Sequence, residues 1–593
     1  MKKFLLIILS AIALVGCTLE EQVLSSSEPD KFYQTVPQCL TGLNGCYLPL
    51  RSIYSNADYF EACEVATDLI YHNTSSYYDA QCNYTQSQAR IGTTIWTQCY
   101  LGVMRCNSIY YAIEKSPLTL EEKMPLMAEA VVLRAFYYYI LTINFGDVPY
   151  YFEPVTDANN DRIAQMPRKP AKELRQILVD ELEDWLLVKQ ALPYIKTYDP
   201  ANNYRIGAMV GLTIGGKLAM WNKRFDKALE FFAPIDKVYT CASIEADELI
   251  GETGRLEEDC LMGYSVSDIM FRNRYTDESI FELPAYSKDY GLKVTTNLAS
   301  RCTPSRSSTA SESALGDEET EDEEGLDLSQ KDDFYNGIRI PELGVNARTT
   351  SPYRPTCYFY KTILPYNADG SRDKRRSVYD TAKAGLGEIV EVEDGGGYLA
   401  WCYKGWKDKT VDINDPSNPP GIFFFNSTAS ATGAPFLGDK FWCPGMIYNQ
   451  DSNNLKIFRY AHVVLDMAEA NMRCGHWDLA RNYLNAVKRR AGRTDYIDTS
   501  AKDEIDFMEK LQQESARELF GEFTRRHNLV RWGIWYDQIV KYSKYPSGSN
   551  EINTPLVGFV MEGPCREYYP IPDQQIVLSN YNLDNKEYDK YGL

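Results

Sequence analysis

A cluster of tyrosines with polar neighbours lies early in the 593-residue chain, within residues 68–96. The tyrosines are Tyr71, Tyr77, Tyr78 and Tyr84, and the polar residues among them include Asn73, Asp79, Asn83 and Arg90. A sugar has an apolar C–H face and a rim of hydroxyl groups. A sugar site therefore needs flat aromatic side chains for the face and amide, carboxylate or guanidinium groups for the rim. The cluster predicts a carbohydrate-binding site. The alternative is that any single ring packs a loop instead of a ligand. Trp96, which begins a regular helix, is expected in the core.

Side chains suited to catalysis or metal binding are scarce. Among the four histidines none stands in an H-x-x-x-H arrangement, and the sequence has no C-x-x-C pair and no glycine-rich phosphate loop. Carboxylates are numerous, but nothing in their spacing points to the acid pair of a glycosidase. We therefore predict a binding protein rather than an enzyme, without a cofactor or metal.

An acidic run at residues 317–333, DEETEDEEGLDLSQKDD, raises the question of calcium. If Gly325 is placed at the sixth position of an EF-hand loop, Thr320 comes first and Lys331 last, which fails the pattern of carboxylate ligands. We interpret the run as a solvated loop. Contact with calcium or with a partner stays open.

The N-terminus has the features of an export signal. Lys2 and Lys3 precede an apolar run, residues 4–15, that is too short to span a bilayer, and Cys17 follows Gly16. This pattern is similar to a bacterial lipoprotein leader, with residues 1–16 removed and lipid attached to Cys17; the alternative is an ordinary secretory signal with a chance cysteine. Several acyl chains anchor a protein stably, because each buried methylene contributes about 0.8 kcal/mol. Thr18 stands where an Asp would indicate inner-membrane retention, so we expect the outer membrane, with residues 17–30 as a lipidated tether.

The net charge bears on whether the chain binds nucleic acid, and the cysteine content bears on whether it forms disulfides. The net charge of −20 at pH 7 argues against nucleic acid as a partner. Besides Cys17, fourteen of the fifteen cysteines remain, an even count that permits disulfides, although a chain of this size does not need them. Cys39 with Cys46, and Cys99 with Cys106, lie seven residues apart, a spacing that places two small residues on one face of a helix. We expect buried free thiols.

Helical periodicity flanks a long irregular part of the chain. The organising stretch is 129–154, where an apolar face recurs at helical spacing, Gly146 can end the helix and Pro149 cannot continue it. That face should pack on a helix at 95–115, which should lie antiparallel to a first helix near 32–50. Further helices are expected at 171–192, 205–221, 225–238, 455–473, 477–491 and 503–530.

A faint internal repeat favours paired helices. FDKALEF at 225–231 and WDLARNY at 477–483 share the pattern aromatic-Asp-x-Ala-x-x-aromatic at the start of a helix. In tetratricopeptide-like hairpins a small Ala lies where two helices cross closely. We therefore predict an all-α fold: a tetratricopeptide-like helix-pair scaffold (31–240 and 455–593) with a large irregular insertion (241–454) containing short strands such as SIFEL at 279–283 and GIFFF at 421–425. Residues 31–593 should form a single domain.

A series of motifs extends along the chain. They are FGDVP at 145–149, DESIFEL at 277–283, DKR at 373–375, FRYAHVVLDMAEA at 458–470, LNAVKRRAG at 484–492, ESARELFGEF at 514–523, LVRWG at 529–533 and YYPIP at 568–572. In their joint order they resemble the landmarks of the SusD/RagB family of Bacteroidetes outer-membrane nutrient-binding lipoproteins. Tyr460-Ala461-His462 departs from the family's usual Arg-Leu-Ala, and the acidic run and the many cysteines are particular to this chain.

The resemblance implies a cell-surface lipoprotein that captures an oligosaccharide and acts as a hinged lid on a SusC-like TonB-dependent transporter in the outer membrane. It also implies a ligand site shared between the early irregular segment and the insertion. The insertion would contribute Tyr286, Tyr290, Asn297, Arg301, Trp401 and Trp406. Two alternatives stay open: peptide capture, as in RagB-like members, and a surface scaffold that binds no ligand.

Overall fold

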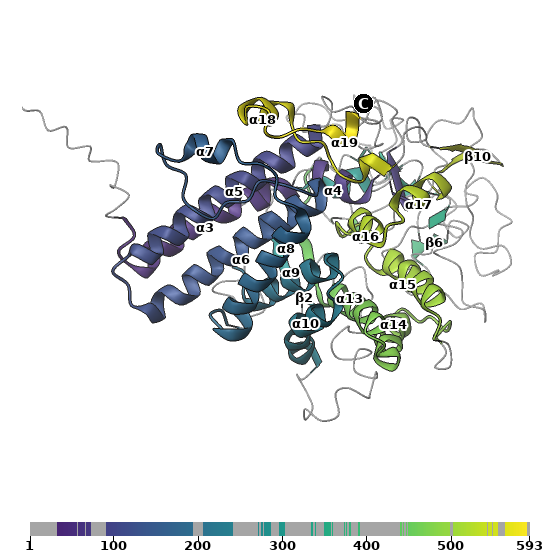
Figure 1. The fold of residues 1–593 in the computed structure, drawn as a ribbon. Helices are drawn as coiled ribbons and strands as arrows, with labels where there is room; N and C mark the ends of the chain where they lie inside the picture. The colour runs from purple at the N-terminus through teal and green to yellow at the C-terminus, as the bar shows by residue number, and fades with distance from the viewer. Residues whose placement is uncertain are drawn as a thin grey trace, which may run out of the picture.

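The computed structural model describes residues 32–72 (without 56 and 66), 90–193, 205–240, 451–497, 502–542 and 564–589, with short pieces within 271–450 and 544–555. Its main helices are α3 (Val36–Tyr54), α4 (Ala57–Glu64), α5 (Arg90–Lys115), α6 (Leu120–Phe145), α8 (Ala171–Leu182), α9 (Ala208–Trp221), α10 (Phe225–Thr240), α13 (Tyr460–Arg473), α14 (Trp477–Arg490), α15 (Glu504–Glu518), α16 (Arg525–Trp532) and α17 (Trp535–Tyr542). Short helices are α7 (Asn160–Ala164), α12 (Leu298–Cys302), α18 (Asp573–Leu578) and α19 (Lys586–Asp589). Figure 1 shows α3, α5 and α6 side by side at one side of the molecule, α8 to α10 in the middle and α13 to α17 at the other side. The predicted all-α scaffold is confirmed.

Helix α6 lies at the centre of the first helical group. It begins nine residues before the predicted stretch, because Thr119 and Glu122 form a reciprocal capping box at its start. It ends as predicted at Phe145, where Gly146 has a φ of 70°. Its contacts with α5 are the most extensive between any two described elements, and α5 packs in turn on α3. Among the described residues α6 is the one helix long and apolar enough to cross a membrane, but 94% of its apolar window is buried inside the protein, as in a core helix.

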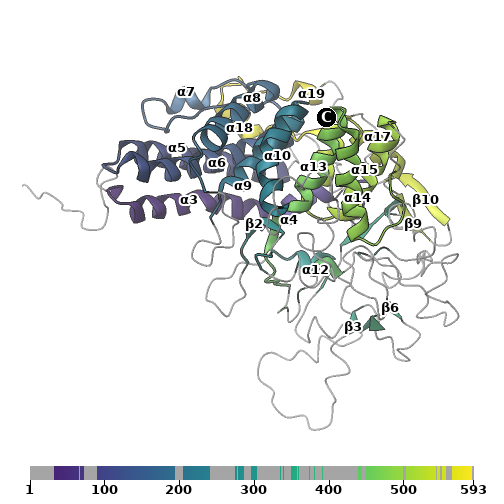
Figure 2. The same ribbon diagram turned by 90° about the horizontal axis from the view of Figure 1, so that it is seen from below.

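Paired helices continue through the rest of the scaffold. α9 packs on α10, α13 packs on α14, and α10 packs on α13 (Figure 2). The repeat identified in the sequence begins α10 and α14, and its two alanines, Ala228 and Ala480, are fully buried. Close approach also requires glycine, because a Cβ at Gly216 of α9 would lie 2.2 Å from the ring of Phe232 in α10. The helix-pair prediction is therefore confirmed in this part of the chain.

Three predicted helices differ in the structure. The stretch predicted as a helix at 455–473 begins as strand β8 (Leu455–Arg459), which pairs with a strand of the insertion, and its helix, α13, starts at Tyr460. The stretch predicted at 171–192 is α8 followed by a π-helical turn, Glu183–Val188. The stretch predicted as one helix at 503–530 is broken into α15 and α16, with Gly521 and Phe523 at positive φ between them. The carboxylate of Glu64 in α4 accepts hydrogen bonds from the backbone N–H groups of Gly521, Thr524 and Arg525. This long-range contact stabilises the break and satisfies the first N–H groups of α16.

The described parts of the insertion attach to the scaffold through two antiparallel strand pairs. β2 (Ser279–Leu283), the predicted SIFEL strand, pairs with β8 (Leu455–Arg459). β1 (Ile70–His72) pairs with β5 (Tyr353–Pro355). The shorter pairs are β3 (Phe334–Tyr335) with β4 (Ile338–Arg339), β6 (Tyr379–Asp380) with β7 (Val390–Glu391), and β9 (Lys544–Ser547) with β10 (Asn550–Pro555). In Figure 2, β2 and α12 lie on one side of the helical layers.

A buried network of charges also holds the insertion. Arg375, from the DKR motif, is fully buried and forms ion pairs with Asp373, Glu514 and Glu518. Glu518 is shared with Arg459, which ends β8, at 2.7 Å. A buried charge is stable only when it is paired, so these contacts tie the insertion to α15.

The cysteines that the structure describes are free. Cys39, Cys46, Cys63, Cys99, Cys106, Cys302 and Cys443 are buried and Cys474 is partly exposed. The seven buried cysteines of this set meet the expectation of buried free thiols, whereas Cys474 does not. GIFFF at 421–425, the acidic run and the leader lie outside the described residues.

Candidate functional site

The β1–β5 strand pair brings together the two parts of the chain that were predicted to share a ligand site. β1 ends at His72 and α5 begins at Arg90, so these two elements flank the tyrosine-rich segment. β5 belongs to the insertion, and α12, which carries Arg301, contacts it. Tyr71 of β1 stands opposite Arg354 of β5. The early segment and the insertion thus meet at α4, β1, β5 and α12.

A carboxylate, a phenol and a guanidinium form the centre of this meeting point. The hydroxyl of Tyr353 donates to Glu61 Oε1 at 2.6 Å. Arg301 Nη1 donates to the same oxygen at 3.3 Å and to the Tyr353 hydroxyl at 3.1 Å. The side chain of Glu61 is 2% exposed, whereas that of Arg301 is 29% exposed. The cluster therefore has a buried carboxylate, Glu61, beneath a guanidinium, Arg301, that reaches the surface.

Burial sets the electrostatics of the cluster. Burial raises the pKa of Glu61, although the hydrogen bond from Tyr353 and the charge of Arg301 oppose the rise. Burial also raises the pKa of Tyr353 well above its usual value, and the Glu61 charge adds to this effect. Tyr353 is therefore a neutral donor at pH 7. Within the described part of the chain, Glu61 Oε2 is buried without a hydrogen-bond partner.

Arg90 and Asp58 form a second charged pair beside this cluster. Arg90 is the first residue of α5, and its Nη1 lies 2.5 Å from Oδ2 of Asp58 in the first turn of α4. The Arg90 side chain is 59% exposed. Solvent screens such an exposed pair, so it contributes little to stability. Its effect is to position the Arg90 side chain beside α4.

The predicted ligand-binding residues fall into two groups. Tyr71, Arg90, Asn297 and Arg301 are described. Arg90 and Arg301 pair with Asp58 and Glu61 of α4, Asn297 accepts a hydrogen bond from the backbone N–H of Arg301, and Tyr71 lies in β1. The ring of Tyr71 is 4% exposed, so its open surface in this conformation is small. Tyr77, Tyr78, Tyr84, Tyr290, Trp401, Trp406 and the lipidation residue Cys17 lie outside the described residues, as does Tyr286. Their roles stay predictions, and Trp96, expected in the core, is 3% exposed.

Three members of the cluster were missed in the sequence. Glu61 and Asp58 lie in a short helix, α4, within a stretch that has little helical periodicity, and Tyr353 lies in a three-residue strand. The signal for Tyr353 was its place in SPYRP, where an aromatic residue between prolines suggests an edge strand. Nothing in the sequence indicated that Glu61 meets a residue 292 positions later.

A surface hollow of about 410 Å³ lies between α15, α17 and the residues after β5. The residues that line it include Tyr358, Gln512, Gln538 and Arg525. Arg525 is held by Asp68, with Nε at 2.8 Å from Oδ1 and Nη2 at 2.6 Å from Oδ2. Amide and phenol groups around an open hollow can bind hydroxyl groups. This hollow lies at the Asp68 end of β1, next to the meeting point described above.

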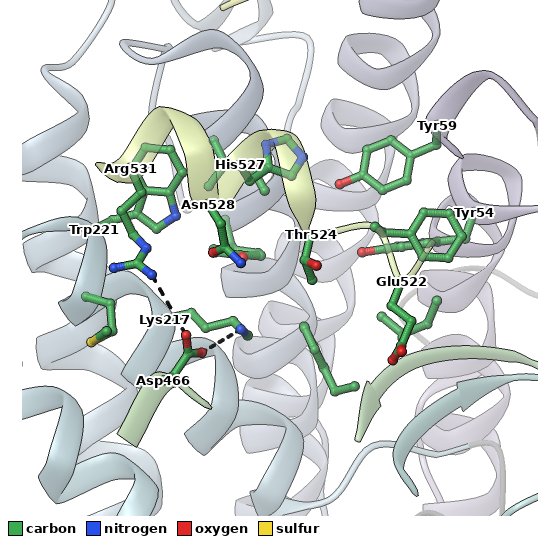
Figure 3. Close-up of a pocket in the computed structure, with 16 residues that line it drawn as sticks. Tyr54, Tyr59, Lys217, Trp221, Asp466, Glu522, Thr524, His527, Asn528 and Arg531 are labelled. Carbon is green, nitrogen blue, oxygen red and sulfur yellow. Dashed lines mark hydrogen bonds and ion pairs between the residues drawn. The ribbon is translucent and has the colours of Figure 1, made fainter. Parts of the chain in front are cut away.

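A separate cavity lies between helices of the scaffold (Figure 3). Lys217 Nζ donates to Asp466 Oδ2 at 2.7 Å, and Arg531 lies 3.9 Å from the same carboxylate. Tyr54 and Tyr59 line the opposite side. The cations are neutralised within the cavity, and none of the described ligand-binding candidates lines it. We therefore assign it to the scaffold rather than to the ligand site.

A thiol–imidazole pair borders this cavity. Cys63 Sγ lies 3.3 Å from His527 Nε2. Burial raises the pKa of the Cys63 thiol well above its usual value, and burial together with Arg526 lowers the pKa of His527 to about 3. Both groups are neutral at pH 7, so the pair lacks the thiolate that a nucleophile requires. No group of three or more potential metal ligands occurs among the described residues.

Comparison with known proteins identifies the family. One profile, described as the SusD family, matches residues 446–588, and a second, described as "Starch-binding associating with outer membrane", matches residues 31–186. The chain belongs to the SusD/RagB family. The SusD-like protein P25 of Formosa agariphila is 30% identical over 135 residues, which span 23% of this chain and 24% of that protein.

Solved SusD structures share the fold over nearly the whole chain. A SusD-like carbohydrate-binding protein from Bacteroides fragilis has a TM-score of 0.63 and 16% identity, covering 93% of this chain and 100% of that one. Surface glycan-binding protein A from Bacteroides thetaiotaomicron, solved in complex with laminarihexaose, has a TM-score of 0.59 and 17% identity, covering 92% and 98%. At this identity the likeness establishes the SusD fold and leaves the ligand to be determined.

Proposed function

We propose that this SusD-family protein is a glycan-binding lipoprotein of the cell surface. It would capture oligosaccharides and deliver them to a SusC-like TonB-dependent transporter in the outer membrane. The observation that carries the proposal is the meeting of the tyrosine-rich segment's two ends with the insertion at α4, β1, β5 and α12. A relative with the same fold was solved with laminarihexaose, and one matching family is described as starch-binding and associated with the outer membrane; both support a carbohydrate ligand.

The ligand site would combine aromatic faces with charged groups at its rim. Tyr77, Tyr78, Tyr84, Tyr290, Trp401 and Trp406 are the proposed stacking residues, and Tyr71 is a further aromatic candidate. Arg90 and Arg301 are the proposed hydrogen-bond donors to sugar hydroxyls. Arg301 is suited to this role because Glu61 and Tyr353 hold its guanidinium at the surface. A preorganised donor loses less conformational entropy on binding than a mobile one.

Delivery requires no chemical step. A ligand that binds the closed state of a lid more tightly than the open state shifts the lid toward closure. Lipid attached to Cys17 would keep the protein at the membrane where the transporter lies. Binding, anchoring and docking are therefore sufficient for the proposed role.

Calorimetric titration of the chain without residues 1–17 tests the ligand and the site together. Laminarihexaose and a panel of other oligosaccharides are titrated alongside a pool of peptides. We expect an oligosaccharide to bind and the Tyr77→Ala, Tyr78→Ala double variant to lose at least about tenfold in affinity, equivalent to about 1.4 kcal/mol. Tyr111→Ala is the matched control, because Tyr111 is a 42% exposed tyrosine on α5 that belongs to none of the proposed contacts.

Three outcomes would contradict the proposal. Equal affinity of the double variant and the control would remove the site assignment. Binding of peptides alone would replace the glycan with the RagB-like alternative. Absence of any ligand, together with indifference to both variants, would favour the surface scaffold.

A further inference from the structure

The antiparallel helices α3 and α5 have a defined register. Arg105 Nη1 of α5 donates to the carbonyl oxygen of Gly45 in α3 at 2.9 Å. One turn away, a Cβ built on Gly42 would lie 2.6 Å from Cδ1 of Ile109. Residue 45 therefore stands near 105, and residue 42 near 109. This register sets Cys46 of α3 against Cys106 of α5.

Both cysteines are part of the closely packed interface between α3, α5 and α6. Cys46 and Cys106 are each 0% exposed. The hydroxyl of Tyr137 in α6 donates to the carbonyl oxygen of Cys46 at 2.5 Å, and the ring of Tyr137 fills the space beside Gly102 in α5. These contacts hold the two thiols at the same level of the helix pair.

The other two cysteines of these helices are out of register. Cys39 lies seven residues before Cys46 and Cys99 lies seven residues before Cys106, so in an antiparallel pair they are displaced in opposite directions. At a rise of 1.5 Å per residue each displacement is about 10 Å. A disulfide needs Cα atoms within roughly 4.4–6.8 Å of each other. Among these four cysteines, the register matches Cys46 only with Cys106.

The Cys46 thiol also acts on the Cys106 thiol electrostatically. Burial raises the pKa of the Cys106 thiol well above its usual value, and the neighbouring Cys46 thiol raises it further. In the packed fold the Cys106 thiol is therefore protonated and inert. A reaction between them has to occur before α3 and α5 close on each other.

The structure describes Cys46 and Cys106 as free thiols. We propose that in the exported protein an oxidant joins them in a disulfide between α3 and α5, an inference that rests on the export included in the proposed function. The oxidant would be the disulfide of a thiol–disulfide oxidoreductase in the cell envelope. The thiolate of Cys46 or Cys106 attacks that disulfide and releases one oxidant thiol, and the second cysteine thiolate then resolves the mixed disulfide and releases the other. Two protein thiols lose two protons and two electrons, and one oxidant disulfide becomes a dithiol.

Peptide mapping of the protein from the cell envelope tests the proposal. Free thiols are alkylated under denaturing, non-reducing conditions, and the chain is digested with trypsin. Cleavage after Lys31, Arg51, Arg105 and Lys115 gives peptide 32–51, with Cys39 and Cys46, and peptide 106–115, with Cys106 alone. We expect these two peptides to be recovered as one cross-linked species that a reductant separates, with Cys99 alkylated in peptide 91–105.

Single variants identify the bonded residue in peptide 32–51. Cys39→Ser should leave the cross-link intact, whereas Cys46→Ser should abolish it and leave Cys106 alkylated. Alkylation of both Cys46 and Cys106 in the unmodified protein overturns the proposal, and this result needs no variant to fold. Glycan titration of the same preparation separates the two proposals, since a chain that binds glycan with both thiols free refutes only the disulfide. An uncleaved leader would overturn the export on which the inference rests.

Discussion

The buried charge network should be most sensitive to substitution of Glu518. Its side chain is fully buried and lies between three guanidinium groups: Arg459 Nη1 at 2.7 Å, Arg375 Nη1 at 2.9 Å, and Arg490 Nη2. Glu518→Gln keeps the shape of the side chain but removes the charge, so three buried cations lose a shared counterion. Removing one partner of a buried pair costs about 3–5 kcal/mol. We expect the free energy of unfolding at pH 7 to fall by that amount.

Glu504→Gln is the matched control on the same helix. Glu504 begins α15 and pairs with Arg473, but its side chain is 58% exposed. Exposed pairs contribute about 0–1 kcal/mol. Urea unfolding followed by circular dichroism measures both variants, provided that the slope with denaturant stays constant. Equal losses in the two variants, or a loss below about 1 kcal/mol at Glu518, would refute the argument that the network stabilises the fold.

The pH dependence of this network has a definite sign. Burial alone would raise the pKa of Glu518, but Arg490, Arg459 and Arg375 outweigh it and hold the pKa well below its usual value. A carboxylate with a depressed folded-state pKa contributes stability above its unfolded pKa, about 4.3, and loses it as the pH falls. The unmodified protein should therefore lose stability progressively below about pH 5, and Glu518→Gln should reduce that loss. An unchanged acid profile in the variant would contradict the assignment.

Three further predictions concern packing, a helix break and the anchor. Gly102→Ala in α5 should destabilise the fold by about 1–3 kcal/mol, because its Cβ would lie 2.2 Å from the ring of Tyr137. Gly45→Ala, whose Cβ would have nothing within 4 Å, should be neutral or stabilising. Thermal melts compare the two variants, and equal shifts in melting temperature would contradict the packing argument. Burial raises the pKa of Glu64 to about 7, so its contribution to stability is present below about pH 4.5 and lost as the pH rises through 7. Glu64→Gln should therefore remove the dependence of the free energy of unfolding on pH between these values. If the variant keeps this dependence, another group causes it. Cys17→Ser should release the protein from the outer membrane in cell fractionation, and continued membrane association would refute the lipid anchor.

Local sequence patterns were sufficient for most of the scaffold. The apolar face before Gly146 predicted α6 and its end, and the repeated aromatic-Asp-x-Ala pattern predicted the starts of α10 and α14. These features depend on residues a few positions apart, which the helix itself brings together. The ordered motifs likewise predicted the SusD fold, because each is a short run of neighbouring residues that can be recognised without the tertiary structure.

Contacts between distant residues decided the rest. The sequence pattern continued through Gly521, but Glu64, 457 positions earlier, caps α16 and stabilises a break in the helix. Glu61 and Tyr353 meet only because β1 pairs with β5, and the match of Cys46 with Cys106 depends on the register of α3 against α5. The sequence by itself therefore determined which residues form helices and which segments are rich in ligand-binding chemistry. The tertiary structure alone decided which of those side chains are buried, paired and held at the surface, because burial and pairing depend on elements that the sequence places far apart.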